Sequence, residues 1–155
     1  SGNMSFHCED CSAHHFAETV YQTHQVIILP PVEFIKEFPD EDVTIHIDRM
    51  RLTQVITNFL GNAKKFTSQG HIKLGYFCDK EKKEIHFFVE DTGAGIPKEE
   101  LQMIFERFYK RNEFVQGVGL GLAISKVIVE KMNGHIDVQS EVNKGSRFTA
   151  VLPYL

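Results

Sequence analysis

The chain has 155 residues, of which 42% are hydrophobic and 25% charged, and its net charge is -4. This size and composition are typical of one globular domain. No stretch approaches the roughly 20 apolar residues of a membrane-spanning helix, and the scattered charges offer no basic face for nucleic acid. The three cysteines are an odd number, which disfavours a disulfide framework and favours a reducing, cytoplasmic setting. We expect one domain over residues 4–155, with residues 1–3 set aside as a cloning remnant.

The first half of the chain contains its clearest helical pattern. A helix is expected over residues 12–24, and the stretch from "VIILPPVEFIKEF" into "DVTIHI" is β-rich, interrupted by two prolines. The next helix has Asp48 as its expected N-cap. Its apolar stripe recurs at helical spacing and consists of Leu52, Val55, Ile56, Phe59, Leu60 and Ala63.

In the second half, "HIKLGYFCD" and "KEIHFFVED" predict two strands around a charged turn. A short helix is expected over roughly 98–104, and a longer one follows "GVGLGL" and ends at Asn133-Gly134. "HIDVQSE" and "RFTAVLPYL" predict a terminal strand pair. Because strands and helices mix without regular βαβ alternation, the pattern indicates an α+β fold with one mixed, mostly antiparallel sheet and helices on one face.

Three polar residues share one edge of the clearest helix. Asn58, Asn62 and Lys65 lie at i, i+4 and i+7, beside the apolar stripe. An amide oxygen is a hard ligand that suits Mg²⁺, and a lysine supplies a point charge for phosphate. Taken alone, the pattern favours a solvated helix edge over a binding site.

The stretch "VEDTGAGIP" places Asp91 where an apolar strand ends. Gly93 and Gly95 allow a tight turn and the close approach of a flat ligand. A buried carboxylate here would accept a hydrogen bond from the adenine 6-amino group, whereas the guanine carbonyl would be rejected. The alternative is a strand-to-helix turn in which Asp91 only caps.

The stretch "GVGLGL" differs from two known phosphate motifs. It lacks the Lys-Ser/Thr of a Walker loop, and Leu122 stands where a dinucleotide fingerprint has its third glycine. Gly117, Gly119 and Gly121 leave amides unshielded at the start of a helix expected to begin near Leu120, where a polyphosphate would fit. A flexible turn would use the same residues.

Together these stretches resemble the catalytic ATP-binding domain of sensor histidine kinases, in the superfamily of gyrase, heat-shock chaperone and mismatch-repair ATPases. "RLTQVITNFLGNAKKFT" resembles the N box, "DTGAGIP" the first glycine box, "FERFYKR" the F box and "GVGLGLAIS" the second glycine box. The resemblance runs from about Val32 to Pro153. It implies a two-layer α/β sandwich of the Bergerat type with a flexible ATP lid over about 97–118.

The resemblance also implies roles for single residues. Asn62 would bind Mg²⁺, with Asn58 in the same pocket and Lys65 near the phosphates, and Asp91 would accept from adenine. Lys110 or Arg111 would reach the γ-phosphate, while Phe105 and Phe108 would pin the lid. The other positions implied to contact the nucleotide are Gly93, Gly95, Ile96, Gly117, Val118, Gly119, Leu120, Gly121, Leu122 and Thr149.

The implied reaction is phosphoryl transfer from ATP to a histidine on a separate dimerisation domain, and then to a response regulator receiver domain. Where chaperone and gyrase relatives carry a water-activating Glu, this chain has Asn58. The histidines at 46, 71, 86 and 135 fall in strand patterns, so the isolated, monomeric chain is not expected to phosphorylate itself. A homodimeric parent protein could carry a membrane anchor. The alternative function is a nucleotide-binding regulatory module without phosphotransfer.

The sequence "HCEDCSAHH" offers a competing metal site. Cys8, Cys11, His14 and His15 are zinc-ligand types within a few residues. A structural zinc site usually draws its second ligand pair from a separate loop, so we expect this segment to be the irregular start of the domain.

Overall fold

The elements alternate along the chain much as the periodicity predicts. The computed structural model describes residues 4–104 and 113–154, and only the backbone for 113–120. In chain order the described elements are β1 (Glu9–Ser12), α1 (Ala13–Gln25), β2 (Val32–Glu37), β3 (Thr44–Ile47), α2 (Arg49–Phe66), β4 (Gly70–Asp79), β5 (Glu84–Asp91), α3 (Lys98–Leu101), α4 (Glu113–Lys131), β6 (His135–Glu141) and β7 (Gly145–Pro153).

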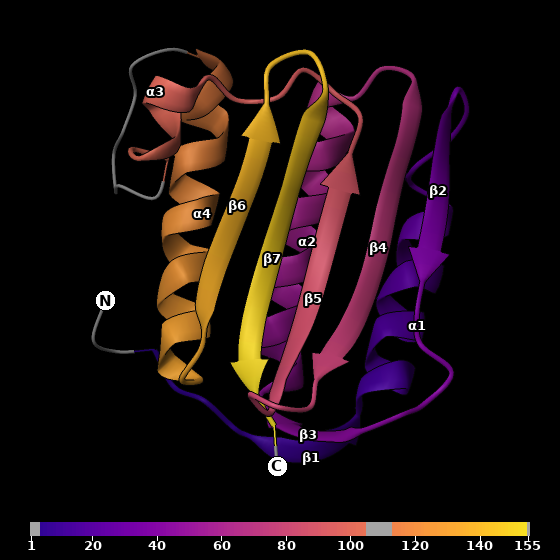
Figure 1. Cartoon of the computed structure of the whole chain (residues 1–155), viewed down its shortest axis with the longest axis vertical. Coiled ribbons are helices and arrows are strands. Elements are labelled where there is room, and N and C mark those ends of the chain that lie inside the picture. The colour runs from indigo at the N-terminus through magenta and orange to yellow at the C-terminus, as the bar shows by residue number, and fades with distance from the viewer. Residues whose placement is uncertain (1–3, 105–112, 155) are drawn as a thin grey trace.

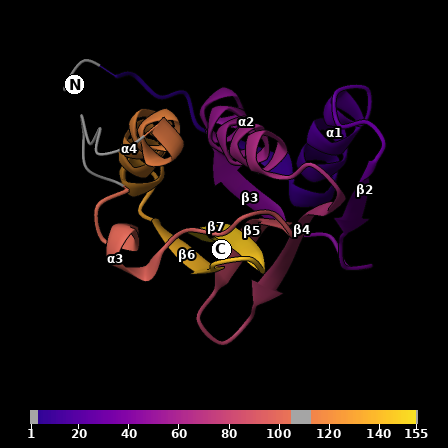
Figure 2. The same ribbon diagram turned by 90° about the horizontal axis from the view of Figure 1, so that it is seen from above.

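A five-stranded sheet forms one layer of the molecule (Figure 1). Its strand order is β2-β4-β5-β7-β6, with β2 parallel to β4 and every other pair antiparallel. β1 and β3 form a separate two-stranded sheet at one end. The helices α1, α2 and α4 cover one face of the large sheet (Figure 2). The predicted two-layer α/β sandwich with a mixed, mostly antiparallel sheet is therefore confirmed.

α2 lies in the middle of the helix layer, and its position follows from its apolar stripe. All six predicted stripe residues are at most 2% exposed and face the core. The Asp48 carboxylate caps the helix by accepting from the Arg51 amide at 3.1 Å, and it also accepts from the His7 amide at 2.8 Å. Burial alone would raise the pKa of Asp48, but these backbone hydrogen bonds outweigh burial and lower it.

The region around α1 differs from the prediction in two places. The first helix lies within one residue of its expected bounds, and Ser12 caps it. β1 was not predicted, because only Cys11 of its four residues is buried and so no alternation is visible. The predicted β-rich stretch becomes a strand only at Val32, since residues 26–31 form turns that contain the cis Pro30-Pro31 bond.

α4 begins earlier than predicted. The helix was expected near Leu120, but it starts at Glu113, so Gly117, Gly119 and Gly121 lie within it rather than ahead of it. Glycine costs a helix about 1 kcal/mol relative to alanine, but it can adopt helical angles, and the apolar residues on either side continue the helical pattern. The lid predicted over about 97–118 covers α3, the start of α4 and residues outside the described ranges. Its flexibility stays a prediction.

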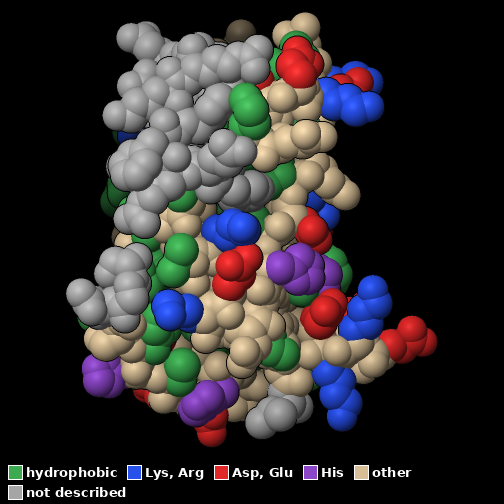
Figure 3. All heavy atoms as spheres, turned by 90° about the vertical axis from the view of Figure 1, so that its left-hand side faces the viewer, with side chains coloured by type: hydrophobic (Ala, Val, Ile, Leu, Met, Phe, Trp, Pro, Cys, Tyr) green, Lys and Arg blue, Asp and Glu red, His purple; other side chains and the backbone are tan. Residues whose placement is uncertain are grey.

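The side of the molecule on which α4 lies carries Lys and Arg side chains interspersed with Asp and Glu (Figure 3). The described part of this face therefore shows no continuous basic surface of the kind that binds nucleic acid. None of the described helices combines the length and apolarity needed to cross a lipid bilayer.

The Asp48 cap generates a stability prediction. Replacing Asp48 with Ala should lower the free energy of unfolding by about 1 kcal/mol at pH 7, whereas Asn, which also caps, should cost less. The pKa of Asp48 is lowered in the folded state, so its contribution is present above the unfolded pKa of about 3.9 and is lost as the pH falls through the folded value. Urea unfolding between pH 7 and 3 measures this. A gap between wild type and Asp48→Ala that stays constant down to pH 3 would contradict it.

Candidate functional site

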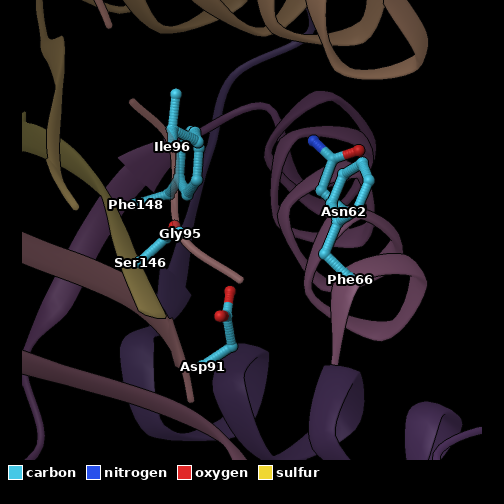
Figure 4. A pocket seen from close by; sticks show the side chains of 7 residues that line it. All are labelled: Asn62, Phe66, Asp91, Gly95, Ile96, Ser146 and Phe148. Carbon is cyan, nitrogen blue, oxygen red and sulfur yellow. The ribbon is translucent and has the colours of Figure 1, made fainter. Parts of the chain in front are cut away.

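A pocket opens between α2 and the ends of β5 and β7 (Figure 4). Asn62 and Phe66 of α2 face Asp91 of β5 across it. The lining residues are Asn62, Phe66, Asp91, Gly95, Ile96, Ser146 and Phe148. Four predicted site residues from two separate motifs thus meet in one cavity. Its free volume is about 10 Å³, enough for about one water molecule.

Asp91 supplies a buried carboxylate to this pocket. It ends β5, pairs in register with Ser146 of β7 and is 8% exposed. One carboxylate oxygen accepts from the Gly93 amide at 2.8 Å. Burial raises the pKa of Asp91, while the backbone amides of Gly93 and Ser146 oppose the rise. The carboxylate keeps unused acceptor capacity at the pocket wall, because an ionised carboxylate accepts several hydrogen bonds.

The glycines after Asp91 allow close backbone packing. A β-carbon at Gly93 would lie 2.4 Å from the Phe66 carbonyl oxygen, and one at Gly95 would lie 2.2 Å from the Glu141 carbonyl oxygen. Gly95 also has a φ of +76°, a conformation that other residues rarely adopt. The same glycines that were predicted to allow a flat ligand to approach therefore also allow their own loop to pack between the end of α2 and the end of β6.

A serine pair on β6 and β7 completes the pocket wall. The Ser140 hydroxyl accepts from the Ile96 amide at 2.7 Å and lies 2.8 Å from the Ser146 hydroxyl. This contact fixes two lining residues, Ile96 and Ser146, relative to each other. Neither serine was predicted. Ser146 lies two residues before Phe148 on β7, so the two side chains lie on the same, core-facing side of the strand.

Thr149 lies away from this pocket, which corrects its predicted place near adenine. Side chains alternate between the two faces of a strand, and Thr149 pairs with Phe88 whereas Ser146 pairs with Asp91. Thr149 therefore points to the sheet face opposite Asp91. The hydroxyl that lines the pocket belongs to Ser146, three residues earlier.

The amide residues of α2 are in contact. Asn62 donates from Nδ2 to Oδ1 of Asn58 at 3.3 Å, and both side chains are half-buried. Lys65 is exposed, and its ammonium lies 5.5 Å from the centre of the Phe66 ring. The structure thus brings Asn58 into contact with Asn62, which lines the pocket, and places Lys65 beside the ring of Phe66, another lining residue.

The second glycine motif meets this site at one described position. A β-carbon at Gly121 would lie 2.0 Å from Nδ2 of Asn58, so α4 packs directly on that amide. Leu122 is fully buried in the core, and its contact with a nucleotide stays a prediction. Residues 117–120 follow the helical backbone of α4, and their side chains are outside the description. Phe105, Phe108, Lys110 and Arg111 fall outside the described residues.

The alternative zinc site gains no support. Cys8 is exposed while Cys11 is buried. Among residues 4–104 and 113–154, no three His, Cys, Asp or Glu side chains gather closely enough to hold a metal ion.

The described site thus combines amides, a carboxylate and glycine turns between a helix layer and a mixed sheet. Residues 47–155 match the family described as histidine kinase-, DNA gyrase B- and HSP90-like ATPase. The chain belongs to this family.

Similar proteins narrow the comparison to sensor kinases. The chain is 38% identical over 128 residues to sensor histidine kinase WalK of Bacillus subtilis and 44% identical over 110 residues to sensor protein SrrB of Staphylococcus aureus. These matches cover 79% and 68% of this chain but only 21% and 19% of those proteins. The chain therefore spans about a fifth of their length.

Two solved structures share the fold. Full-length ShkA in complex with AMPPNP superposes with a TM-score of 0.86 at 28% identity, over 97% of this chain and 32% of that one. A nucleotide-free catalytic domain of histidine kinase ThkA superposes with a TM-score of 0.83 at 28% identity, over 96% of this chain and 97% of that one.

The raised pKa of Asp91 predicts an unusual pH dependence. Because the folded state disfavours the ionised carboxylate, Asp91→Asn should be at least as stable as wild type at pH 7. Any gain in stability of Asp91→Asn over wild type should disappear as the pH falls through the folded pKa of Asp91 towards the unfolded value of about 3.9. Asp91→Ala also leaves the Gly93 amide without its acceptor and should cost about 1–3 kcal/mol. Urea unfolding across this pH range measures both, and an Asn variant clearly weaker than wild type at pH 7 would contradict the interpretation.

Proposed function

We propose that this chain is the ATP-binding catalytic domain of a sensor histidine kinase. In this proposal the γ-phosphoryl group of ATP passes to a histidine on a dimerisation domain of the same protein, and then to a response regulator. The observation that carries the proposal is the single pocket shared by Asn62 and Asp91. The similarity to WalK and SrrB and the AMPPNP complex of ShkA support it.

Asp91 would recognise the adenine base. Its carboxylate already accepts from Gly93 and retains lone pairs for the 6-amino group. A guanine carbonyl in that place would set two acceptors against each other and be rejected. Phe66, Ile96 and Phe148 supply apolar walls on which the base would lie, and Ser146 adds a hydroxyl.

Asn62, Lys65 and α4 would hold the phosphates. The Asn62 side-chain oxygen fits Mg²⁺, which when bound neutralises charge on the phosphates. Lys65, together with Lys110 or Arg111, would supply cations to the phosphate oxygens. Gly117, Gly119 and Gly121 would approach the phosphates through their backbone.

Asn58 favours transfer over hydrolysis. A neutral amide cannot accept a proton from water at neutral pH, so it cannot act as a general base. Phosphoryl transfer depends mostly on alignment and charge stabilisation, and here a histidine on the partner domain would provide the attacking nitrogen. Since the chain consumes ATP in this proposal, we place it in the cytoplasm, monomeric in isolation and dimeric within its full-length protein.

Nucleotide binding should appear as Mg²⁺-dependent stabilisation. ATP at about 100 times its dissociation constant should add about 2.7 kcal/mol to the free energy of unfolding. Asn62→Ala should lose the Mg²⁺-dependent part because it removes the ligand oxygen, while the adenine contacts of Asp91 remain. Thermal unfolding with ATP, in Mg²⁺ and in EDTA, measures both effects. A variant that retains the full Mg²⁺-dependent shift would show that Asn62 is not the metal ligand.

The isolated chain should bind ATP without labelling itself. Four of its histidines lie on strands β3, β4, β5 and β6 rather than on a partner helix, namely His46, His71, His86 and His135. Incubation with γ-labelled ATP should leave this chain unlabelled, whereas adding the dimerisation domain of its own full-length protein should produce an acid-labile phosphohistidine on that domain. Strong label on the isolated chain would refute the first expectation. Binding without transfer to the added domain would favour a regulatory nucleotide-binding module.

A further inference from the structure

We propose that Gly121 of α4 is a positioning residue for the Mg²⁺ site and that it acts through Asn58. The absence of a side chain at Gly121 leaves room for the Asn58 amide, which in turn fixes the orientation of Asn62. This inference rests on the proposed function, in which Asn62 is the metal ligand. It assigns Gly121 a role beyond that of presenting a backbone amide to phosphate.

The contact at Gly121 differs in kind from those at the glycines near Asp91. A β-carbon there would lie 2.0 Å from Nδ2 of Asn58 and 2.9 Å from both Cγ and Oδ1. At Gly93 and Gly95 the obstructing atoms are backbone carbonyl oxygens, which cannot give way without moving whole segments. The end of the Asn58 side chain can swing aside. A methyl group at position 121 should therefore displace one amide and leave the fold intact.

That amide controls which atom Asn62 presents. A side-chain amide has one acceptor oxygen and one donor nitrogen, and only the oxygen can bind Mg²⁺. Asn62 uses its nitrogen to donate to Oδ1 of Asn58, so its oxygen is left for the metal. If Asn58 swings away, this constraint is lost and the Asn62 amide can rotate freely. Partners that orient a metal ligand typically contribute about 10–100-fold to metal affinity.

The test compares two glycine-to-alanine changes in neighbouring helices. Gly121→Ala introduces the clash, whereas Gly61→Ala adds a methyl group to α2 at an exposed position with no atom within 4 Å. Calorimetry would measure the affinity for ADP in Mg²⁺ and in EDTA. Gly121→Ala should reduce the affinity in Mg²⁺ by about 10–100-fold more than it reduces the affinity in EDTA. Gly61→Ala should retain the full Mg²⁺ gain.

If Gly121 acted only by contacting phosphate, without positioning Asn58, the result would differ. Added bulk against the phosphates would weaken ADP binding equally in Mg²⁺ and in EDTA. Equal losses, or an unchanged Mg²⁺ gain in Gly121→Ala, would overturn the proposal.

Asn58→Ala provides a second variant that does not depend on the tolerance of α4. It removes both the clash partner and the acceptor for Asn62, so it should also reduce the Mg²⁺ gain. Adding Gly121→Ala to it should cause little further loss, because residues that act through one contact are not additive. Fully additive losses would overturn the coupling. If wild type binds no nucleotide in either buffer, the proposed function fails instead, and non-additive unfolding energies for the two substitutions would still report the Gly121–Asn58 contact.

Discussion

The packing of α2 against the large sheet is the constraint on which the site depends. Six apolar side chains on one face of this helix are buried, and fully burying a large one such as Phe59 contributes roughly 1.5–3 kcal/mol. Consecutive residues on a helix are 100° apart, so fixing this face also fixes the adjoining edge that carries Asn58 and Asn62. The core therefore fixes where the backbone of this polar edge lies, while the orientation of its side-chain amides depends on their own contacts.

The two ends of the candidate nucleotide site are constrained differently. Near Asp91 the packing is backbone against backbone: Gly93 fits against Phe66, Gly95 against Glu141, and a β-carbon at Gly145 would lie 1.9 Å from the Asp91 carbonyl oxygen. At the other end α4 rests on the tip of the Asn58 side chain. A side-chain tip moves more easily than a strand end. The end near Asp91, where we propose that the base binds, is thus the more rigid part, and adjustment during binding should concentrate where α4 meets α2.

Features that depend on local periodicity could be predicted from the sequence, whereas features that depend on tertiary contacts could not. The stripe of α2 and its Asp48 cap are visible as spacing alone, and the polarity of Asp91 at the end of an apolar strand marked the pocket. β1 was missed because its pairing with β3 leaves three of its four residues at least partly exposed. The family resemblance implied Thr149, but this residue lies on the face of the sheet opposite Asp91, whereas Ser146 shares the face of Asp91. The contact of Gly121 with Asn58 joins two helices, and no pattern within either helix records it.

Two aspartates near opposite ends of α2 differ in the balance between the cost of burial and hydrogen bonding. Asp48 is 6% exposed and Asp91 is 8% exposed, yet their pKa values move in opposite directions. At Asp48 the amides of His7 and Arg51 outweigh the cost of burial, so ionisation there stabilises the fold. At Asp91 the cost of burial exceeds the stabilisation by the amides of Gly93 and Ser146. A neutral side chain at this position would therefore make the fold more stable. Ionised Asp91 thus lowers the stability of the free protein, and it lies at the wall of a pocket. A ligand that donates a hydrogen bond to this carboxylate would offset that cost.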